Sequence, residues 1–263
     1  MVGQGFFATG WVRFGPDPVV KDWVAHARPA ALEALTAVEN AHWWRCGGTW
    51  FAGVNVLAND AAGRIGGGPP LGGAAVDFVA DALGLSLPLD PGQLSVTRPG
   101  YPQPSEDESA AAARYRRDRD AAHVDGLLPI GPDRRRMIRE PHGFILGLPV
   151  TESSADAAPL VVWEGSHQIM RRAFAAALHG HPPEDWPDID VTEAYHAARR
   201  EVFATCRRVA IPARPGEATV IHRLALHGVA SWAEGATADP AGRAIVYFRP
   251  ELPGGIADWL AAP

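Results

Sequence analysis

The hydrophobic pattern of the chain changes near residue 93, and before that point it is mainly helical. Apolar residues recur at helical spacing in residues 17–28, 30–44 and 74–85, and Asp17 stands where the first of these segments needs an N-cap. Proline lacks the backbone N–H that a helix interior uses, so Pro29 predicts a break or a kink. Residues 1–92 are therefore expected to be mostly helical.

From residue 93 onward the pattern is typical of strands. Six runs are rich in β-branched and apolar residues and are separated by turns that contain proline or glycine: 93–98, 143–150, 158–163, 207–212, 218–222 and 243–249. Residues 105–120 read as a helix or a solvated loop. Residues 179–205 read as an insertion, with a helix from about Val191.

These elements predict one domain over residues 1–263, because we find no internal repeat and no linker. Its architecture is expected to be a mainly β sandwich or barrel, with the helical N-terminal part packed on a β core spanning residues 93–250.

Composition narrows the class of protein further. The chain has 263 residues, of which 47% are hydrophobic and 21% charged, as in globular proteins, and its formal charge of −6 gives no indication of nucleic-acid binding. Two cysteines, Cys46 and Cys206, do not form a disulfide framework, and we recognise neither a signal peptide nor a membrane span. We therefore expect a cytoplasmic protein without membrane or nucleic-acid partners.

The stretch AAHVDGLLPIG, residues 121–131, contains the first candidate site. On a strand, His123 and Asp125 would project from one face and could bind one divalent metal ion, although His-x-Asp also occurs by chance. His227, just after the strand 218–222, would complete a 2-His-1-carboxylate triad, which leaves coordination positions open. His222 is the alternative ligand in another register, but a structural role is favoured for it.

Arg243 opens the next strand and is a candidate anion clamp, because a guanidinium pairs bidentately with a carboxylate and keeps its charge when buried. Arg249 lies six residues further on the same strand and shares its face, so it is the rival. A surface ion pair would be the non-functional explanation for Arg243.

Three motifs in order carry a resemblance to a known family: HVD at 123–125, PLVVWEGSH at 159–167 and PGEATVIHRLALHG at 215–228. Together they resemble the phytanoyl-CoA dioxygenase-like family of Fe(II)/2-oxoglutarate-dependent oxygenases over about residues 93–250. The resemblance implies a double-stranded β-helix, that is, a jelly-roll or cupin-like core. It also implies a dioxygenase that hydroxylates or otherwise oxidises a C–H bond of a small-molecule substrate.

The resemblance also implies roles for individual residues. His123, Asp125 and His227 would bind Fe(II), and Arg243 would bind the distal carboxylate of the cosubstrate 2-oxoglutarate, with O₂ as oxidant. A carboxylate at position 125 implies hydroxylation, because related halogenases have a small residue there.

One position departs from the family pattern. The family often has a hydroxyl residue two positions after the distal histidine, where this chain has Val229. Thr151 and Tyr247 are candidates to supply that hydroxyl instead.

Two other functions remain open: a cupin-type metal enzyme that does not use 2-oxoglutarate, and a non-catalytic ligand-binding jelly-roll protein. For the substrate, two features are suggestive. Tryptophans such as Trp43, Trp44 and Trp50 could line a pocket, although such residues are more often core. The run Arg134–Arg136 could bind an anion, although such runs are more often solvated. Oligomeric state cannot be predicted from the sequence.

Overall fold

The structure is a computed structural model that describes residues 2–105 and 108–262. Its strands are β1 (Trp11–Phe14), β2 (Trp44–Arg45), β3 (Trp50–Gly53), β4 (Gln93–Thr97), β5 (Leu127–Ile130), β6 (Arg135–Ile138), β7 (Phe144–Pro149), β8 (Leu160–Trp163), β9 (Arg208–Ile211), β10 (Ala218–His222), β11 (His227–Val229) and β12 (Arg243–Phe248). Its helices are α1 (Val2–Thr9), α2 (Pro18–Thr36), α3 (Ala74–Ala82), α4 (Ala110–Asp118), α5 (Ser166–Leu178), α6 (Thr192–Thr205) and α7 (Gly255–Ala261), with 3₁₀ helices η1 (Val38–Trp43) and η2 (Pro183–Asp188).

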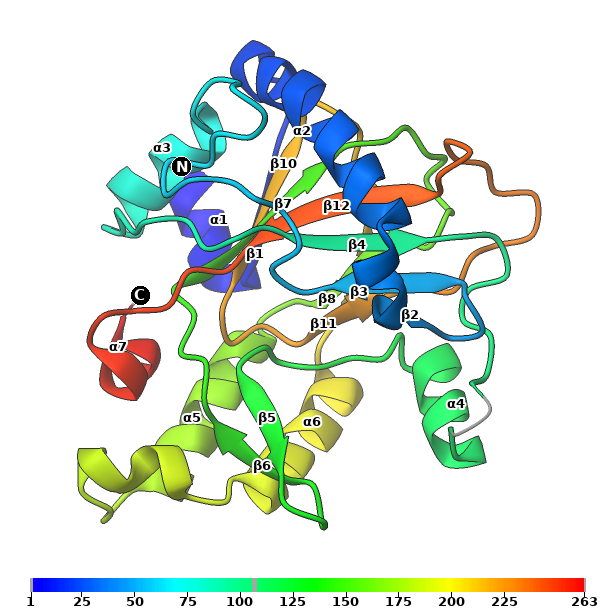
Figure 1. Ribbon diagram of the computed structural model, residues 1–263. Helices are drawn as coiled ribbons and strands as arrows, with labels where there is room; N and C mark the ends of the chain where they lie inside the picture. The colour runs from blue at the N-terminus through cyan, green and yellow to red at the C-terminus, as the bar shows by residue number, and fades with distance from the viewer. Residues whose placement is uncertain (1, 106–107, 263) are drawn as a thin grey trace.

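A large antiparallel sheet has the order β1-β10-β7-β12-β4-β3-β2 (Figure 1). Its centre is β12, which pairs with β7 on one side and β4 on the other. The six runs predicted as strands after residue 93 all contain strands of the structure. The runs at β7 and β12 lack a polar alternation because both faces of these strands are buried.

A smaller sheet, β11-β8-β9, faces the large one, and the two form a jelly-roll core. An apolar cluster lies between them, with members from both sheets: Ile145, Leu160, Val162, Ile211, Ile221, Ala225, Ile245 and Tyr247. A single antiparallel bridge between His123 and His227 extends the small sheet by one short segment. The expected mainly β jelly-roll core with flanking helices is confirmed.

Helix α2 covers the outer face of the large sheet. Its buried residues recur at three- and four-residue spacing from Val20 to Leu35, and they pack against alternate residues of the large sheet. Asp17 caps the helix by accepting a hydrogen bond from the N–H of Val19 at 2.8 Å, as its position predicts.

The predicted break at Pro29 is wrong as a break, because α2 runs continuously from Pro18 to Thr36. The carbonyl group that Pro29 cannot bond belongs to Ala25, and both residues are exposed, so water can hydrate that carbonyl.

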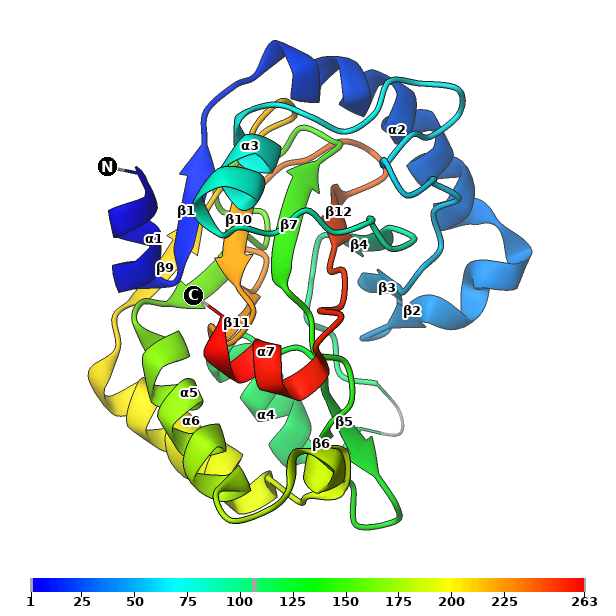
Figure 2. The ribbon, with the colours of Figure 1, turned by 90° about the vertical axis from the view of Figure 1, so that its left-hand side faces the viewer.

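The N-terminal part also contributes strands. β1 extends one edge of the large sheet and β3 and β2 the other. Helices α1 and α3 lie at the β1 edge, where they meet through Phe6 and Phe78 with ring centroids 5.3 Å apart (Figure 2), and η1 lies beside β3. These strands have two to four residues, which is too short for alternation to distinguish them from the helical pattern.

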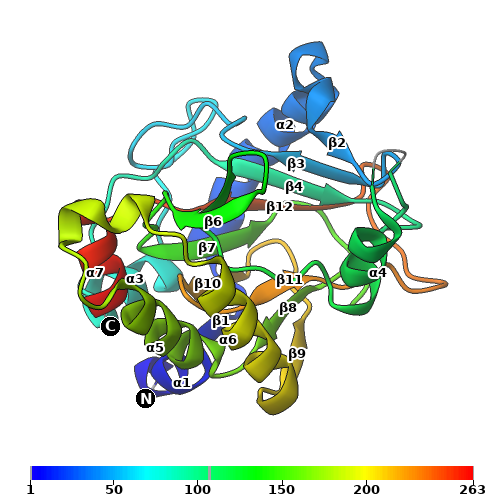
Figure 3. The same cartoon turned by 90° about the horizontal axis from the view of Figure 1, so that it is seen from below.

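A second apolar cluster lies below the jelly roll, where α5 and α6 pack side by side near α7 and the β5-β6 hairpin (Figure 3). α6 begins at Thr192, close to the expected Val191, and belongs to the expected insertion. In the segment 105–120, α4 forms the helix, while residues 106–107 lie outside the described part. None of the helices within residues 2–105 and 108–262 combines the length and the hydrophobicity that a membrane-spanning helix needs.

Candidate metal centre

The two candidate histidines are paired through their backbones. The N–H of His123 donates to the carbonyl of His227 at 2.8 Å, and the N–H of His227 donates to the carbonyl of His123 at 3.0 Å. In such an antiparallel pair the two side chains project from the same face, and the ring centroids lie 4.6 Å apart. Residues 104 positions apart in the sequence are thus brought to one point.

Asp125 lies in a turn rather than on a strand. Of His123 and Asp125, His123 forms a β-bridge, whereas the chain turns at Asp125 and Gly126 before β5 begins. Gly126 has φ +84°, and a Cβ there would lie 2.2 Å from the carbonyl oxygen of Glu140. The turn brings the carboxylate of Asp125 back toward both histidines.

Gly228 explains why glycine follows the distal histidine. A Cβ at this position would lie 2.1 Å from the carbonyl oxygen of Asp120, in the segment that leads to His123. Arg208 of β9 holds that segment through two hydrogen bonds to the Asp120 carboxylate, at 2.7 and 2.8 Å. Close approach of these two segments of the chain therefore requires a residue without a side chain at position 228.

The side chains of His123, Asp125 and His227 could hold a metal ion, because one ligand atom of each lies within 4.8 Å of the others. We call these three side chains the metal-compatible set. Oδ1 of Asp125 lies 3.1 Å from Nε2 of His123 and 3.7 Å from Nε2 of His227. Each Nδ1 faces a carbonyl oxygen, that of Ala121 at 3.0 Å and that of Ala225 at 2.9 Å. A carbonyl only accepts, so each Nδ1 carries a proton, and each Nε2, when it is unprotonated, directs its lone pair to the common centre.

The local charges and burial shift the pKa values of all three groups of this set. Burial alone would raise the pKa of Asp125, but Arg249 and then the histidines bring it well below its ordinary range. Burial, followed by the charge of His123, lowers the pKa of His227 to about 4. Burial also lowers the pKa of His123, but the hydrogen bond and charge of Asp125 outweigh it and raise this pKa. At neutral pH a carboxylate and a neutral His227 are therefore available.

Arg249, the alternative anion clamp, directly follows the last residue of β12, and it is the arginine in direct contact with this set. Its Nη1 lies 3.2 Å from Oδ2 of Asp125, which leaves Oδ1 directed at the histidines. Arg243 is at the other end of β12, six residues away, or roughly 20 Å along a strand. The structure brings His123, Asp125 and His227 together, and it places Arg243 apart from them.

Arg243 is buried on the inner face of the large sheet, and within residues 2–105 and 108–262 its Nη1 has no hydrogen-bond partner. Thr97, its neighbour in register on β4, is also fully buried, and its Oγ1 lacks a partner within the same residues. A cavity of about 10 Å³ contacts Arg243 and Tyr247 but neither His123 nor Asp125. This end of the barrel thus holds a cation and a hydroxyl group with unused hydrogen-bonding capacity.

The hydroxyl of Thr151 is already engaged with the backbone. It donates to the carbonyl of Gly242 and accepts from the N–H of Ala244, both at 2.8 Å. Val229 packs in an apolar cluster. Tyr247, the other candidate, lies beside Arg243: burial raises the pKa of its hydroxyl, and the charge and hydrogen bond of Arg243 act against that rise. Thr97, which sequence reasoning missed because its pairing with β12 is a long-range contact, lies opposite Arg243 in register, and its Oγ1 has no partner among the described residues.

A cavity of about 530 Å³ opens beside the metal-compatible set and contacts His123 and Asp125. Its other prominent walls are Tyr115, Arg116, Arg136, Tyr195, Arg199 and Arg249. Sequence reasoning singled out Arg136 within its basic run but missed the pair on α6. The four-residue spacing of Tyr195 and Arg199, which places both on one helix face, is the signal that could have found them.

His222, the alternative ligand, lies elsewhere. Its Nδ1 accepts from the N–H of Leu224 at 3.0 Å, and its ring centroid lies 4.7 Å from that of His167. Burial lowers the pKa of His222 well below the ordinary value. Its contacts are those of a buried structural histidine.

Comparison with solved structures establishes the fold. The non-haem α-ketoglutarate-dependent carbocyclase SnoK from nogalamycin biosynthesis is similar with a TM-score of 0.53 at 15% identity, covering 98% of this chain and 88% of SnoK. The epimerase SnoN in complex with Fe³⁺, α-ketoglutarate and nogalamycin RO has a TM-score of 0.50 at 15% identity, covering 98% of this chain and 87% of SnoN. EvdMO1 has a TM-score of 0.52 at 15% identity, covering 96% of this chain but 49% of its own. No protein-family model matches the sequence, and no curated protein matches it.

Proposed function

We propose that the chain is a non-haem Fe(II)- and 2-oxoglutarate-dependent dioxygenase, of the phytanoyl-CoA dioxygenase-like type, that hydroxylates a C–H bond of a small molecule. The observation that carries the proposal is the convergence of His123, Asp125 and His227, each with a ligand atom directed at one centre on a jelly-roll scaffold. Two histidines and one carboxylate with open positions are the ligand set of non-haem Fe(II) oxygenases. SnoK, which shares the fold, is α-ketoglutarate-dependent by name, and SnoN is described in complex with Fe³⁺ and α-ketoglutarate.

His123, Asp125 and His227 would hold the iron, and the backbone carbonyls behind both imidazoles would fix the tautomer that binds it. With 2-oxoglutarate bound, the iron centre supplies oxidation by O₂: substrate R–H, 2-oxoglutarate and O₂ give R–OH, succinate and CO₂. Arg249 would keep Asp125 monodentate by occupying its second oxygen. Because Asp125 takes a coordination position, we propose hydroxylation rather than halogenation.

For the cosubstrate, Arg243 is the proposed partner of the distal carboxylate. Its partnerless Nη1 and the partnerless hydroxyl of Thr97 are the donors that a buried carboxylate needs. 2-Oxoglutarate would have to displace side chains that now separate Arg243 from the metal-compatible set, because the cavity at Arg243 has room for about one water molecule.

The small volume of the cavity at Arg243 also favours a second candidate, a cupin-type metal enzyme that does not use 2-oxoglutarate. One experiment separates the candidates: anaerobic addition of Fe(II) and then 2-oxoglutarate to the purified protein, monitored by visible absorption. A charge-transfer band that requires both additions is the expected result. Metal binding without such a band favours the cupin-type enzyme, and no metal binding favours a non-catalytic ligand-binding protein.

A further inference from the structure

The cavity beside the metal-compatible set carries excess positive charge. Four arginines line it, and two of them have carboxylate partners. Arg116 pairs with Glu108 at 2.6 Å, and Arg249 pairs with Asp125 at 3.2 Å. Both of these charges are therefore already neutralised.

Arg136 and Arg199 are the two arginines without such a partner: within residues 2–105 and 108–262, neither forms an ion pair with a carboxylate. Arg136 makes one long hydrogen bond, 3.3 Å from Nη1 to the carbonyl of Leu127. Glu140, the remaining acid in the cavity wall, lies 3.3 Å from Nε2 of His142 instead. The cavity thus presents two guanidinium groups without a counter-charge.

Arg199 is held in place by aromatic rings. Its guanidinium carbon lies 4.6 Å from the ring centroid of Tyr115 on α4 and 5.2 Å from that of Tyr195, one turn earlier on α6. The hydroxyls of Tyr115 and Tyr195 also accept hydrogen bonds from Arg199. A guanidinium has five N–H donors, so donors remain for a ligand beyond those that the two hydroxyls engage. Burial lowers the pKa of Arg136, and the charges of Arg134 and Arg199 contribute to this shift. Two like charges facing one partly buried cavity favour an anion there.

We propose that this cavity binds the primary substrate through an oxyanion, a carboxylate or a phosphate, held between Arg136 and Arg199. The proposal rests on the proposed function in one respect: it takes His123 and Asp125, which line the same cavity, as the place of oxidation. Planar guanidinium groups with free N–H edges are suited to binding such oxyanions bidentately.

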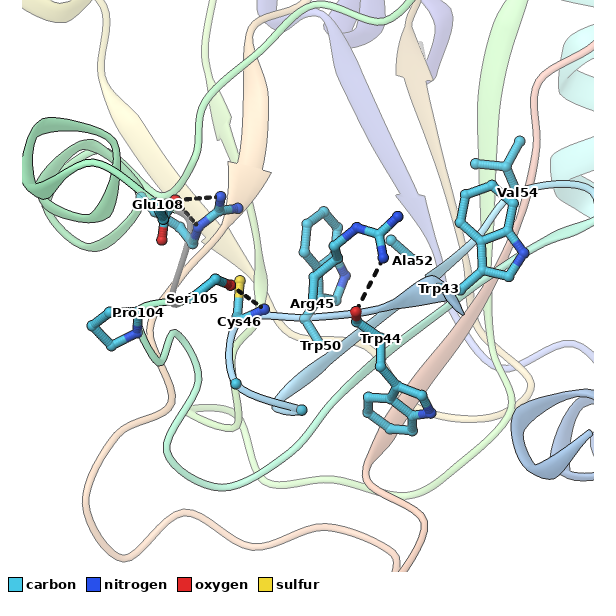
Figure 4. A pocket seen from close by; sticks show the side chains of 13 residues that line it. Trp43, Trp44, Arg45, Cys46, Trp50, Ala52, Val54, Pro104, Ser105 and Glu108 are labelled. Atoms are coloured by element: carbon cyan, nitrogen blue, oxygen red, sulfur yellow. Dashed lines mark hydrogen bonds and ion pairs between the residues drawn. The ribbon is translucent and has the colours of Figure 1, made fainter. Parts of the chain in front are cut away.

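The rest of the substrate is apolar. Trp50, Val54 and Arg116 line this cavity and also an outer cavity of about 1030 Å³, so the two adjoin. Trp43 and Trp44 also line the outer cavity, with Glu108 on the side of α4 (Figure 4), while the ring of Trp44 packs against Phe51 at a centroid distance of 5.4 Å. Aromatic walls favour a hydrocarbon or aromatic body that extends from the anionic group.

Binding of three matched probes tests the inference: 1-naphthoate, 1-naphthyl phosphate and the neutral 1-naphthamide, each titrated calorimetrically into the full chain with and without Co(II). We expect at least one anion to bind, and the amide to bind at least ~10-fold more weakly. The preferred anion distinguishes carboxylate from phosphate. Arg136→Met and Arg199→Met should each weaken anion binding ~10- to 100-fold.

Neighbouring exposed arginines supply the controls. Arg134→Met and Arg200→Met remove the same charge next to each test position, outside the cavity wall, and should change anion affinity less than about twofold. Equal binding of amide and anions, no binding of either anion, or equal effects of test and control variants would overturn the inference. Anion binding that persists when Co(II) fails to bind would contradict the proposed function alone, and Co(II) binding without anion binding would contradict this inference alone.

Discussion

The two ends of β12 differ in whether their arginine has a carboxylate partner. At one end Arg249 pairs with Asp125, although its Nε has no hydrogen-bond partner among the described residues, and the polar atoms of the metal-compatible set face one another. At the other end Arg243 is buried without a carboxylate partner among these residues, and its Nη1 and the Thr97 hydroxyl opposite it both lack a hydrogen-bond partner there. An unsatisfied buried polar group costs about 1–3 kcal/mol, so a fold keeps two of them side by side at a measurable cost in stability. At the first end the protein itself supplies the carboxylate partner, whereas at the second end the unused donors are those that the proposed function assigns to the distal carboxylate of 2-oxoglutarate.

The largest effect is expected at the metal end. Asp125→Ala removes one ligand and the partner of Arg249, so Co(II) affinity should fall by more than the ~10- to 100-fold typical of losing an outer-shell partner. Asp125→Asn tests the same point with a side chain of equal size, and thermal unfolding checks that both variants fold. The exposed Asp133→Ala is the control. Unchanged Co(II) affinity in Asp125→Asn would exclude this metal site.

Exchanging the two arginines for glutamine tests the comparison directly. Arg249→Gln should weaken Co(II) binding ~10- to 100-fold, because it frees Oδ2 of Asp125. Arg243→Gln should leave Co(II) binding within about twofold but weaken 2-oxoglutarate binding to the Fe(II) protein ~10- to 100-fold, since one charged hydrogen-bond pair is lost. Anaerobic titrations followed by calorimetry and by the charge-transfer band measure both quantities. The reverse pattern would make Arg249 the carboxylate clamp.

The pH dependence of metal binding is the next largest effect. Both histidines must be neutral to bind a metal ion. The pKa of His123 is raised, so Co(II) affinity should decrease as pH falls through that pKa, by about tenfold per pH unit. The pKa of His227 is about 4, so it adds no second proton above that pH. Calorimetry in buffers of different ionisation enthalpy should therefore detect release of at most one proton per metal ion above pH 5, and two would contradict the assigned protonation states.

The smallest effect is expected at Thr97. Thr97→Val deletes a buried hydroxyl without a partner, so the free energy of unfolding of the ligand-free protein should stay equal or rise by up to about 1 kcal/mol. The same variant should bind 2-oxoglutarate about 5-fold more weakly. Thr151→Val is the matched control, because its hydroxyl makes two backbone hydrogen bonds and its loss should destabilise the fold by about 1–3 kcal/mol. Denaturant unfolding measures both, and destabilisation by Thr97→Val would show a structural role for that hydroxyl.

The local hydrophobic pattern was sufficient to predict the strands of the jelly-roll core and the helical nature of the long helices. Burial on both faces makes β7 and β12 continuous apolar runs, and the spacing of apolar residues in α2 reports the face it lays on the sheet. The pattern did not predict β1 to β3, because these strands are too short to show alternation. It wrongly predicted a helix break at Pro29, where water can hydrate the exposed carbonyl that proline leaves without a hydrogen bond. Both failures concern competition between weak local preferences and tertiary contacts.

The sequence by itself determined the chemical types at the candidate site: a His-x-Asp pair, a His-Gly pair and arginines that share a face of one strand. Only the tertiary structure decided which of them meet. The bridge between His123 and His227 joins segments 104 residues apart, and close approach at Gly228 makes it possible. The contact of Arg249 with Asp125, and the approach of Arg199 to a shared cavity with Arg136, likewise depend on how sheets and helices pack. Spacing along the chain fixes the face on which a side chain lies, but distances between elements arise from burying apolar surface in a common core.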